Sequence, residues 1–350
     1  MHFDTGRTWR GGQNQVFLLM SGLKKEGMKQ HLVTPADSPL EKKAIELGIE
    51  VSSVDPANDL DVIKGLKFRR IAKKEKPDII HFHTSKSLGI GCWALAGVKV
   101  KTVFTRRVDL PVSTNSINLF KYRSADKKAV ISDFINDHFK SIGFDDAVRI
   151  FSAVDTGKFQ CKDEYNENET VNIGMVGAFD LRHKDFITFI KAADLVLKER
   201  ENEIQFLIAG QGKDEDMIRE LINGLGIQKY VKVEGFIPEI QDFMLSLDIL
   251  VHTVNFEALG TSILQGMSCG LPVIATDVGG IPELIEEGKN GYLVEKNNVE
   301  QTAGRIIELI DNTSKQKELG LRNRLLVERK FSAEKMVSEY LKLYRGLYED

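Results

Sequence analysis

The chain has 350 residues, of which 42% are hydrophobic, and a formal net charge of −3 at pH 7. This length suggests about two domains of roughly 150 residues each, and the apolar content suffices for two cores, which excludes a disordered chain. No apolar run approaches the roughly 20 residues of a membrane-spanning helix, and the opening MHFDTGRTWR lacks the apolar segment of a secretory signal. We therefore expect a cytoplasmic protein.

Strand-like and helical segments alternate through the first half of the chain. The predicted helices cover residues 15–26, 40–47 and 61–74, and the predicted strands cover residues 1–4, 30–34, 78–83, 101–105 and 128–132. A strand–helix–strand order of this kind predicts a parallel sheet with right-handed crossovers.

The second half repeats the alternation. Its predicted helices cover residues 186–200, 215–225, 262–268 and 333–347, and its predicted strands cover residues 171–176, 204–209, 231–234, 249–252, 272–275 and 291–294. The polar stretch 152–170 is typical of a linker. These patterns predict an α/β protein with two doubly wound domains facing across a cleft, where ligands bind at the carboxyl ends of the strands.

The distribution of charge and the spacing of the cysteines indicate what kind of partner and compartment to expect. Residues 1–150 hold 25 Lys and Arg against 17 Asp and Glu, a net charge of +8, whereas residues 151–350 hold 23 against 34, a net charge of −11. Such asymmetry suggests an anionic partner for the first half. Cys92, Cys161 and Cys269 fit neither a zinc pattern nor a disulfide framework, which favours a reducing compartment.

The stretch FEALGTSILQGMSCGLPVIA, residues 256–275, combines a loop carboxylate with a helix start. Gly260 permits close approach of the backbone to a ligand, and the helix that begins at Thr261 and Ser262 offers free N–H groups that suit a phosphate. Glu257 can accept hydrogen bonds from sugar hydroxyls, and Gln265 can reach another polar group of the same ligand. The alternative is an ordinary capped helix beside a solvated Glu257.

Two further loops could bind an anion. In VGAFDLRHKDF, Arg182 and Lys184 follow a strand and can neutralise a diphosphate, although a basic surface loop is the alternative. In DTGRTWRGGQNQV, Gly11 and Gly12 precede a helix and could approach an anion, or form only a tight turn. The spacing is that of neither a dinucleotide fingerprint nor a P-loop. The acidic run 214–216 opens a helix, so we interpret it as a cap and predict no metal site.

Two strand ends of the first half carry polar side chains. His81 and His83 lie on the same face of their strand, and each could serve a site or be a satisfied structural histidine. Arg106, Arg107 and Asp109 follow the next strand, where Asp109 could simply hold an arginine.

The helical stretch KGLKFRRIAKKEK, residues 64–76, is basic. Attraction to an anionic membrane surface, worth about 1 kcal/mol per basic residue, is one interpretation and a solvated helix face is the other. The acidic second half and the few aromatic residues within basic runs argue against a nucleic-acid partner. The basic residues that would meet a membrane are Lys64, Lys67, Arg69, Arg70, Lys73 and Lys74.

Together these motifs resemble the family 4 glycosyltransferases of the GT-B fold, along essentially the whole chain. The most specific part is residues 256–294, while VGAFDLRHKDF is similar to the diphosphate loop of the family and VEGFIPEI to its base-binding segment. The resemblance implies an N-terminal acceptor-binding Rossmann-like domain, residues 1–154 with the C-terminal helix 333–350, and a donor-binding Rossmann-like domain, residues 155–332.

The resemblance also implies an activity. Such an enzyme transfers a sugar, with retention, from a UDP-, GDP- or ADP-linked donor to a glycan or glycolipid acceptor, as in lipopolysaccharide or cell-surface polysaccharide synthesis. It needs no metal or other cofactor, and with the basic helix it would lie peripherally on the inner face of the cytoplasmic membrane. The alternative is a GT-B fold epimerase that acts on a UDP-sugar.

Carried over by position, the resemblance assigns roles to individual residues. Candidate catalytic residues are Glu257, which would contact the donor sugar, and His83 and Asp109 in the first domain. Gln265 stands where the family usually has a second glutamate that reaches the donor ribose, and Ala178 stands where it often has an arginine. The candidate donor-binding residues are Gly11, Gly12, Arg182, Lys184, Phe236, Ile237, Leu259, Gly260, Thr261, Ser262 and Gln265.

Overall fold

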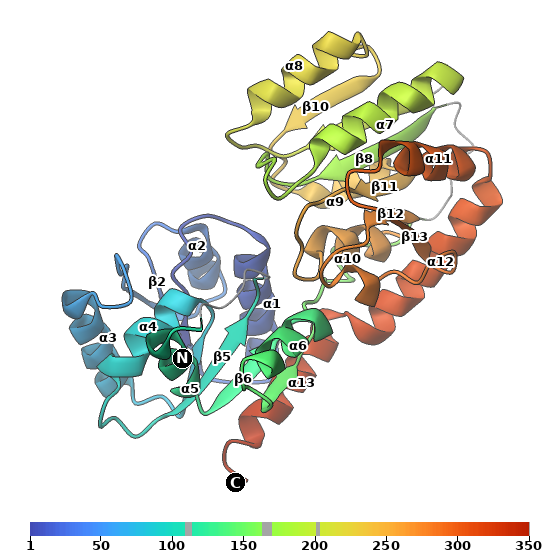
Figure 1. Ribbon diagram of the computed structural model, residues 1–350. Helices are drawn as coiled ribbons and strands as arrows, with labels where there is room; N and C mark the ends of the chain where they lie inside the picture. Colours follow the sequence, from blue (N-terminus) through green and yellow to red (C-terminus); the bar gives the residue numbers. More distant parts are fainter. Residues whose placement is uncertain (109–113, 163–169, 201–203, 350) are drawn as a thin grey trace. The chain divides into compact units, whose positions relative to one another are not determined.

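A computed structural model describes residues 1–108, 114–162, 170–200 and 204–349. The chain forms two compact units, each built on a parallel sheet (Figure 1). Unit 1 comprises Met1–Ala153 and Ala333–Asp350, and unit 2 comprises Val154–Ser332. The predicted α/β fold with two Rossmann-like domains is confirmed. Within the described residues, no helix is both long and apolar enough to cross a membrane.

In the described part of unit 1, the strands pair in the order β3-β2-β1-β4-β5-β6-β7. The strands are β1 (His2–Phe3), β2 (His31–Thr34), β3 (Glu50–Ser53), β4 (Ile79–Phe82), β5 (Lys101–Arg106), β6 (Lys127–Val130) and β7 (Ala147–Arg149). The helices are α1 (Gly11–Lys25), α2 (Pro39–Glu46), α3 (Val62–Glu75), α4 (Ser85–Ala94), α5 (Ser116–Arg123), α6 (Asp133–Ser141) and α13 (Ala333–Arg345).

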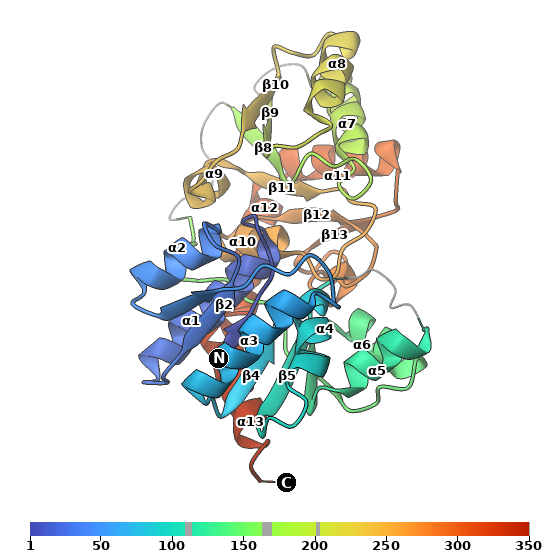
Figure 2. The ribbon, with the colours of Figure 1, turned by 90° about the vertical axis from the view of Figure 1, so that its left-hand side faces the viewer.

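Helices cover both faces of this sheet. α3 and α4 lie side by side on one face (Figure 2). There Phe68 packs against Phe3 and Phe82. On the other face α1 packs against α13, the last helix of the chain. A Cβ on Gly22 would lie 2.3 Å from the Val337 side chain, so this glycine allows the two helices to approach closely.

In the described part of unit 2, the strands pair in the order β10-β9-β8-β11-β12-β13. The strands are β8 (Val171–Val176), β9 (Ile204–Ala209), β10 (Val231–Gly235), β11 (Ile249–His252), β12 (Val273–Thr276) and β13 (Gly291–Val294). The helices are α7 (Phe186–Glu199), α8 (Glu215–Leu225), α9 (Ile240–Ser246), α10 (Thr261–Ser268), the 3₁₀ helix η1 (Ile281–Glu283), α11 (Val299–Ile310) and α12 (Thr313–Lys330).

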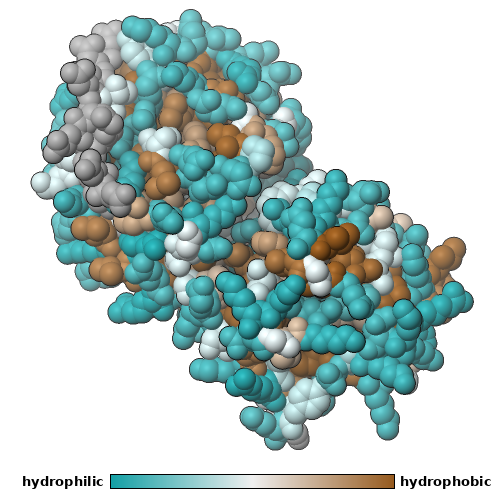
Figure 3. Space-filling view, turned by 180° about the vertical axis from the view of Figure 1, so that it is seen from behind, coloured by the Kyte–Doolittle hydropathy of each residue, from teal (hydrophilic) through white to brown (hydrophobic). Residues whose placement is uncertain are grey.

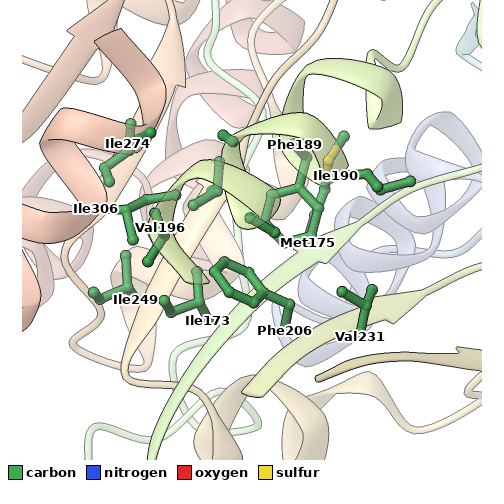
Figure 4. Packing of buried hydrophobic residues seen from close by; sticks show 14 of the residues in the cluster. Ile173, Met175, Phe189, Ile190, Val196, Phe206, Val231, Ile249, Ile274 and Ile306 are labelled. Carbon is green, nitrogen blue, oxygen red and sulfur yellow. The ribbon is translucent and has the colours of Figure 1, made fainter. Parts of the chain in front are cut away.

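The core of unit 2 lies between the sheet and α7 with its neighbours α8 and α11. Figure 4 shows Ile173 and Phe206 of the sheet facing Phe189 and Val196 of α7, and all four are buried. Burying each such side chain contributes roughly 1.5–3 kcal/mol, so this layer holds the strand ends of unit 2 in place. α9, α10 and α12 pack together on the opposite side. At the surface shown in Figure 3, hydrophilic residues predominate and hydrophobic ones form small patches.

Candidate active site

The strand order of unit 2 reverses between β8 and β11, and ligands of open α/β sheets bind at the carboxyl ends of the strands at such a point. The loop after β8 carries Lys184, and the loop after β11 carries Glu257. Backbone contacts join the two loops: Lys184 bridges to Val254, and the Asp185 N–H donates to the Thr253 carbonyl at 3.0 Å. Residues far apart in the sequence therefore meet at this edge of the sheet.

Four side chains form a connected group, which we call the Glu257 cluster: Lys184, His252, Glu257 and Ser262. The Lys184 ammonium lies 2.5 Å from Glu257 Oε2, and His252 Nε2 lies 3.2 Å from the same oxygen. The other ring nitrogen, Nδ1, lies 3.3 Å from Ser262 Oγ. Nε2 also lies 3.3 Å from the Lys184 ammonium, which can only donate. In the tautomer that carries its proton on Nε2, the ring donates to Glu257, and Nδ1 accepts from the Ser262 hydroxyl.

Burial and charge fix the protonation states of this cluster. Burial lowers the pKa of His252 to about 4, so the ring is neutral at pH 7. Burial would raise the pKa of Glu257, but the Lys184 charge and the hydrogen bond from His252 outweigh it and hold that pKa well below its usual range. Glu257 is therefore ionised at neutral pH. His252 was not among the predicted site residues, although its position at the carboxyl end of the buried strand β11 was an available signal.

The start of α10 lies beside this cluster. Gly260 precedes the helix with φ 105° and ψ 74°, a conformation that favours glycine. Within the described residues no side chain caps α10, so the N–H groups of its first turn remain available to a ligand. Thr261 and Ser262 are partly exposed in that turn, and Gln265 is partly exposed one turn further on, while Leu259 is buried.

A glycine turn after β12 supports the backbone of Glu257. The Gly280 N–H donates to the Glu257 carbonyl at 3.1 Å. Gly279 has φ 58°, and a Cβ on it would lie 1.9 Å from the same carbonyl oxygen. Only glycine fits here, so the turn sets the position of the Glu257 carboxylate.

The structure brings Lys184 into the Glu257 cluster but not Arg182. The Arg182 side chain is 72% exposed and makes a paired contact with Asp180, at 3.2 Å through Nε and 3.1 Å through NH2. The acidic run 214–216 opens α8 as predicted, with Asp214 at the N-cap position and Glu215 and Asp216 in the first turn, but the Asp214 side chain bonds elsewhere. Its Oδ2 accepts from the Leu181 N–H at 2.7 Å, and it makes no cap hydrogen bond to α8. This hydrogen bond stabilises the loop that carries Arg182 and Lys184, because it satisfies the Leu181 N–H.

Phe236 and Ile237 follow β10, at the same carboxyl edge of the sheet. Phe236 is 53% exposed and Ile237 is partly buried. The loops that follow β9 and β10 begin side by side, because the Gly210 N–H donates to the Gly235 carbonyl at 2.8 Å. An exposed aromatic ring at this edge is available for stacking on a planar ligand.

The remaining candidates belong to unit 1. Gly11 and Gly12 open α1, after a loop in which Asp4 accepts from the Gly6 N–H at 2.7 Å. His83 is buried and has a partner at each ring nitrogen: Nδ1 lies 3.1 Å from the Arg107 guanidinium, and Nε2 lies 3.0 Å from His2 Nδ1. Such pairing favours the structural alternative for His83, whose catalytic role stays a prediction. Asp109 lies outside the described residues.

Comparison with known proteins decides the family. The chain matches Glycosyltransferase Family 4 over residues 9–158 and Glycosyl transferases group 1 over residues 159–325. An uncharacterized glycosyltransferase of Methanocaldococcus jannaschii is 30% identical over 80% of this chain and 78% of that protein. The chain belongs to the family 4 glycosyltransferases. The predicted family and the predicted transferase class are thereby confirmed.

Other proteins resemble this glycosyltransferase along most of its length. N-acetyl-alpha-D-glucosaminyl L-malate synthase of Bacillus anthracis is 26% identical over 87% of this chain and 84% of that protein. The lipopolysaccharide core biosynthesis glycosyltransferase LpsE of Rhizobium meliloti is 24% identical over 98% of this chain and 97% of that protein. The crystal structure of Anabaena Alr3699/HepE in complex with UDP and glucose shares the fold, with a TM-score of 0.85 and 18% identity over 99% of this chain and 98% of that one.

Proposed function

We propose that this glycosyltransferase moves a sugar, with retention, from a nucleoside diphosphate donor to a glycan or glycolipid acceptor in lipopolysaccharide or cell-surface polysaccharide synthesis. The observation that carries the proposal is the Glu257 cluster beside the uncapped start of α10 in unit 2. The complex of HepE with UDP and glucose supports the donor class, and the likeness to LpsE supports the pathway.

The diphosphate would bind at the start of α10. The free N–H groups of Thr261 and Ser262 and the partial positive charge of the helix favour an anion there. Lys184 lies close by, since its ammonium is 3.3 Å from the same imidazole that contacts Ser262. As the bond to the sugar breaks, negative charge grows on the departing diphosphate, and these fixed donors stabilise it. Arg182 would have to leave Asp180 to take part.

The sugar would bind at Glu257. Among the described residues, Lys184 and His252 both contact Oε2, so Oε1 can accept a hydrogen bond from a sugar hydroxyl. The Leu259 and Gly260 amides would donate to further hydroxyls. In the transfer step, the bond between the anomeric carbon and the phosphate oxygen breaks while the acceptor oxygen bonds to that carbon on the same face. The acceptor proton passes to the departing phosphate. Phe236 would stack on the donor base, with Ile237 beside it.

The positive charge in this scheme comes from Lys184 and the helix start, so the reaction would need no metal or other cofactor. Activity that persists after exhaustive chelation is the expected result. Activity that is lost with EDTA and restored only by a divalent cation would contradict this part of the proposal.

Thermal shift with UDP-, GDP- and ADP-sugars tests the donor class. A ligand at about 100 times its Kd should add roughly 2.7 kcal/mol to the free energy of unfolding. NMR of the product then reports whether the anomeric configuration is retained. A donor sugar that changes configuration without any acceptor would indicate the epimerase alternative, and no stabilisation by any of the three donors would overturn the proposal.

A peripheral position on an anionic membrane belongs to the same proposal. On α3, Ile63 and Leu66 are 79% and 45% exposed, and Lys67 and Arg70 are exposed on the same helix face. Apolar and basic side chains on one face suit an anionic lipid surface. Arg69 contributes differently, because it donates to the Ala94 and Ala96 carbonyls at the end of α4.

Vesicle co-sedimentation tests the membrane position. Removing both charges in Lys67→Gln/Arg70→Gln should weaken binding to anionic vesicles roughly thirtyfold, at about 1 kcal/mol per charge. The matched control Lys198→Gln/Lys317→Gln removes two exposed lysines of unit 2 and should bind like the wild type. Equal binding to neutral vesicles, or binding that is independent of salt, would contradict the proposal.

A further inference from the structure

A second polar cluster lies in unit 1, at the amino ends of the strands β2 and β3. His31 begins β2, Glu50 begins β3 and Glu75 ends α3. His31 and Glu50 are register partners in the parallel pair β2–β3, so their side chains leave the sheet side by side. The three residues line a cavity of about 160 Å³. Nothing in the proposed glycosyl transfer uses them.

The imidazole of His31 is held in an unusual arrangement. Its Nε2 lies 2.9 Å from Ser52 Oγ, and its Nδ1 is buried without a hydrogen-bond partner among the described residues. Nδ1 lies 3.6 Å from Glu50 Oε2 and 3.9 Å from Glu75 Oε2. When Nε2–H donates to Ser52, the Nδ1 lone pair faces two carboxylate oxygens, and these groups repel one another unless a cation lies between them.

The geometry fits a small divalent cation. The three potential ligand atoms lie within 4.8 Å of one another. In a tetrahedral zinc site with bonds of about 2.0–2.2 Å, ligand atoms are separated by roughly 3.3–3.6 Å, so the distances from His31 Nδ1 to Glu50 and Glu75, 3.6 and 3.9 Å, need only a small contraction. Glu50 can supply that contraction, since its side chain is 69% exposed. The contact with Ser52 also matches the usual arrangement of metal-binding histidines, whose second nitrogen is held by a neighbouring acceptor.

We propose that His31 Nδ1, Glu50 and Glu75 bind a divalent transition-metal ion, for which Zn²⁺ is the best fit. One imidazole and two carboxylates form a ligand set that suits Zn²⁺, and water in the cavity would complete the coordination. Lys74 contacts the other oxygen of Glu75, Oε1, at 3.1 Å, so Oε2 stays directed at His31. The ion would tie the starts of two strands to the end of α3, a structural role within unit 1.

The other histidine cluster of unit 1 does not compete for the ion. His2, His81 and His83 also bring ring nitrogens within 4.8 Å of one another. However, His81 contacts Tyr344 at 2.6 Å and Thr105 at 2.7 Å, and His83 lies 3.1 Å from the Arg107 guanidinium. These partners already satisfy the rings, and the fixed positive charge of the guanidinium opposes a second cation.

Titration of the chelated full-length protein with Co²⁺, followed by displacement with Zn²⁺, tests the proposal. We expect one Co²⁺ per chain with the visible absorption of a low-coordinate nitrogen–oxygen site, and a melting temperature that rises with Zn²⁺. His31→Ala and Glu75→Gln should each weaken the affinity at least tenfold and abolish the rise. His138→Ala removes a histidine of α6 outside both clusters and should bind like the wild type.

Glu50→Gln keeps the test decisive if the buried variants fail to fold, because the Glu50 side chain is largely exposed. It should fold normally and bind Co²⁺ at least tenfold more weakly. Wild-type affinity in Glu50→Gln or in a folded His31→Ala, or no stoichiometric binding of Co²⁺ or Zn²⁺, would overturn the proposal. In the last case His31 would be an imidazolium paired with two carboxylates.

Discussion

His252 connects the two features that make the candidate active site, the ionised Glu257 and the start of α10. It is fully buried, donates to the carboxylate and accepts from Ser262. Because the His252 ring is neutral, it orients the Glu257 carboxylate by a hydrogen bond and adds no positive charge beside Lys184. This places His252 as a positioning residue, whose removal should disturb the carboxylate before it disturbs the fold.

We predict that His252→Leu shifts the acid limb of the pH–activity profile upward, because Glu257 loses a hydrogen bond that lowers its pKa. His252→Gln keeps an N–H donor and should restore most of the wild-type profile. The measurement is kcat/KM for the wild type and both variants, followed from pH 8 down to the lowest pH at which the protein stays folded, because the wild-type pKa of Glu257 lies well below its usual range. A lower kcat/KM with an unmoved acid limb in His252→Leu would indicate a packing role only.

Lys184 is the residue on which diphosphate binding depends most. Loss of a hydrogen bond to a charged group costs about 1.5–3 kcal/mol, so Lys184→Ala should weaken binding of the donor diphosphate by roughly 10- to 150-fold. Calorimetry with UDP, GDP and ADP measures this effect directly. Lys198→Ala removes an exposed lysine that pairs with Asp194 on α7 and serves as the control. Unchanged affinity in Lys184→Ala would remove Lys184 from the site.

At the scale of single elements, the sequence predicted most of the apolar strands but missed several helices, among them the largely buried α4 and the helix α11. The predicted strands 171–176, 204–209 and 249–252 coincide with β8, β9 and β11, because these strands are predominantly apolar, with one polar residue in each. β3 was not predicted, since its sequence EVSS is short and only partly buried at a sheet edge. α12 was not predicted either, because its 18 residues are largely charged and polar and bury only a narrow stripe.

The glycine turn after β12 offers a test at the scale of an element. Gly279→Ala should displace Glu257, because the new Cβ would lie 1.9 Å from the Glu257 carbonyl oxygen. We expect kcat/KM to fall at least tenfold. Gly288→Ala is the matched control: it also has positive φ, 72°, but has nothing within 4 Å of the new Cβ. Both variants should lose about 1–2 kcal/mol of stability from backbone strain. Equal kcat/KM in the two variants would contradict a supporting role for the turn.

At the scale of the whole chain, motifs predicted the family and the location of the candidate site, but not the pairing within it. Lys184 and Glu257 are separated by 73 residues, and only the strand order around β8 and β11 brings them together. Lys184 and Arg182 differ in whether an acid neighbouring in sequence occupies the side chain, and the sequence analysis treated them alike. Asp180 lies two residues before Arg182, so that pairing was the detectable part.

The two units should differ in their sensitivity to acid. In unit 1, burial lowers the pKa of His2 to about 3 and holds the pKa values of His81 and His83 well below their ordinary value, whereas unit 2 has His252 with a pKa of about 4. A group whose folded pKa is depressed binds its proton more readily in the unfolded chain. Each such histidine therefore contributes stability that is complete above about pH 6.5 and is lost as the pH falls toward the folded pKa.

We predict that unit 1 loses protection first, between pH 6.5 and 4, because it holds three of these neutral rings. For a single ring the loss at pH 5 is about 2 kcal/mol, since one pKa unit corresponds to about 1.36 kcal/mol. Hydrogen exchange with mass spectrometry, performed in EDTA from pH 7 to 4.5, separates the peptides of the two units. His138→Ala should leave the pH dependence unchanged. If neither unit loses protection above pH 4.5, the histidines are not held neutral by burial, because the unfolded chain would then have no advantage in binding protons over this range. Parallel loss in both units would contradict the expected order, in which unit 1 opens first.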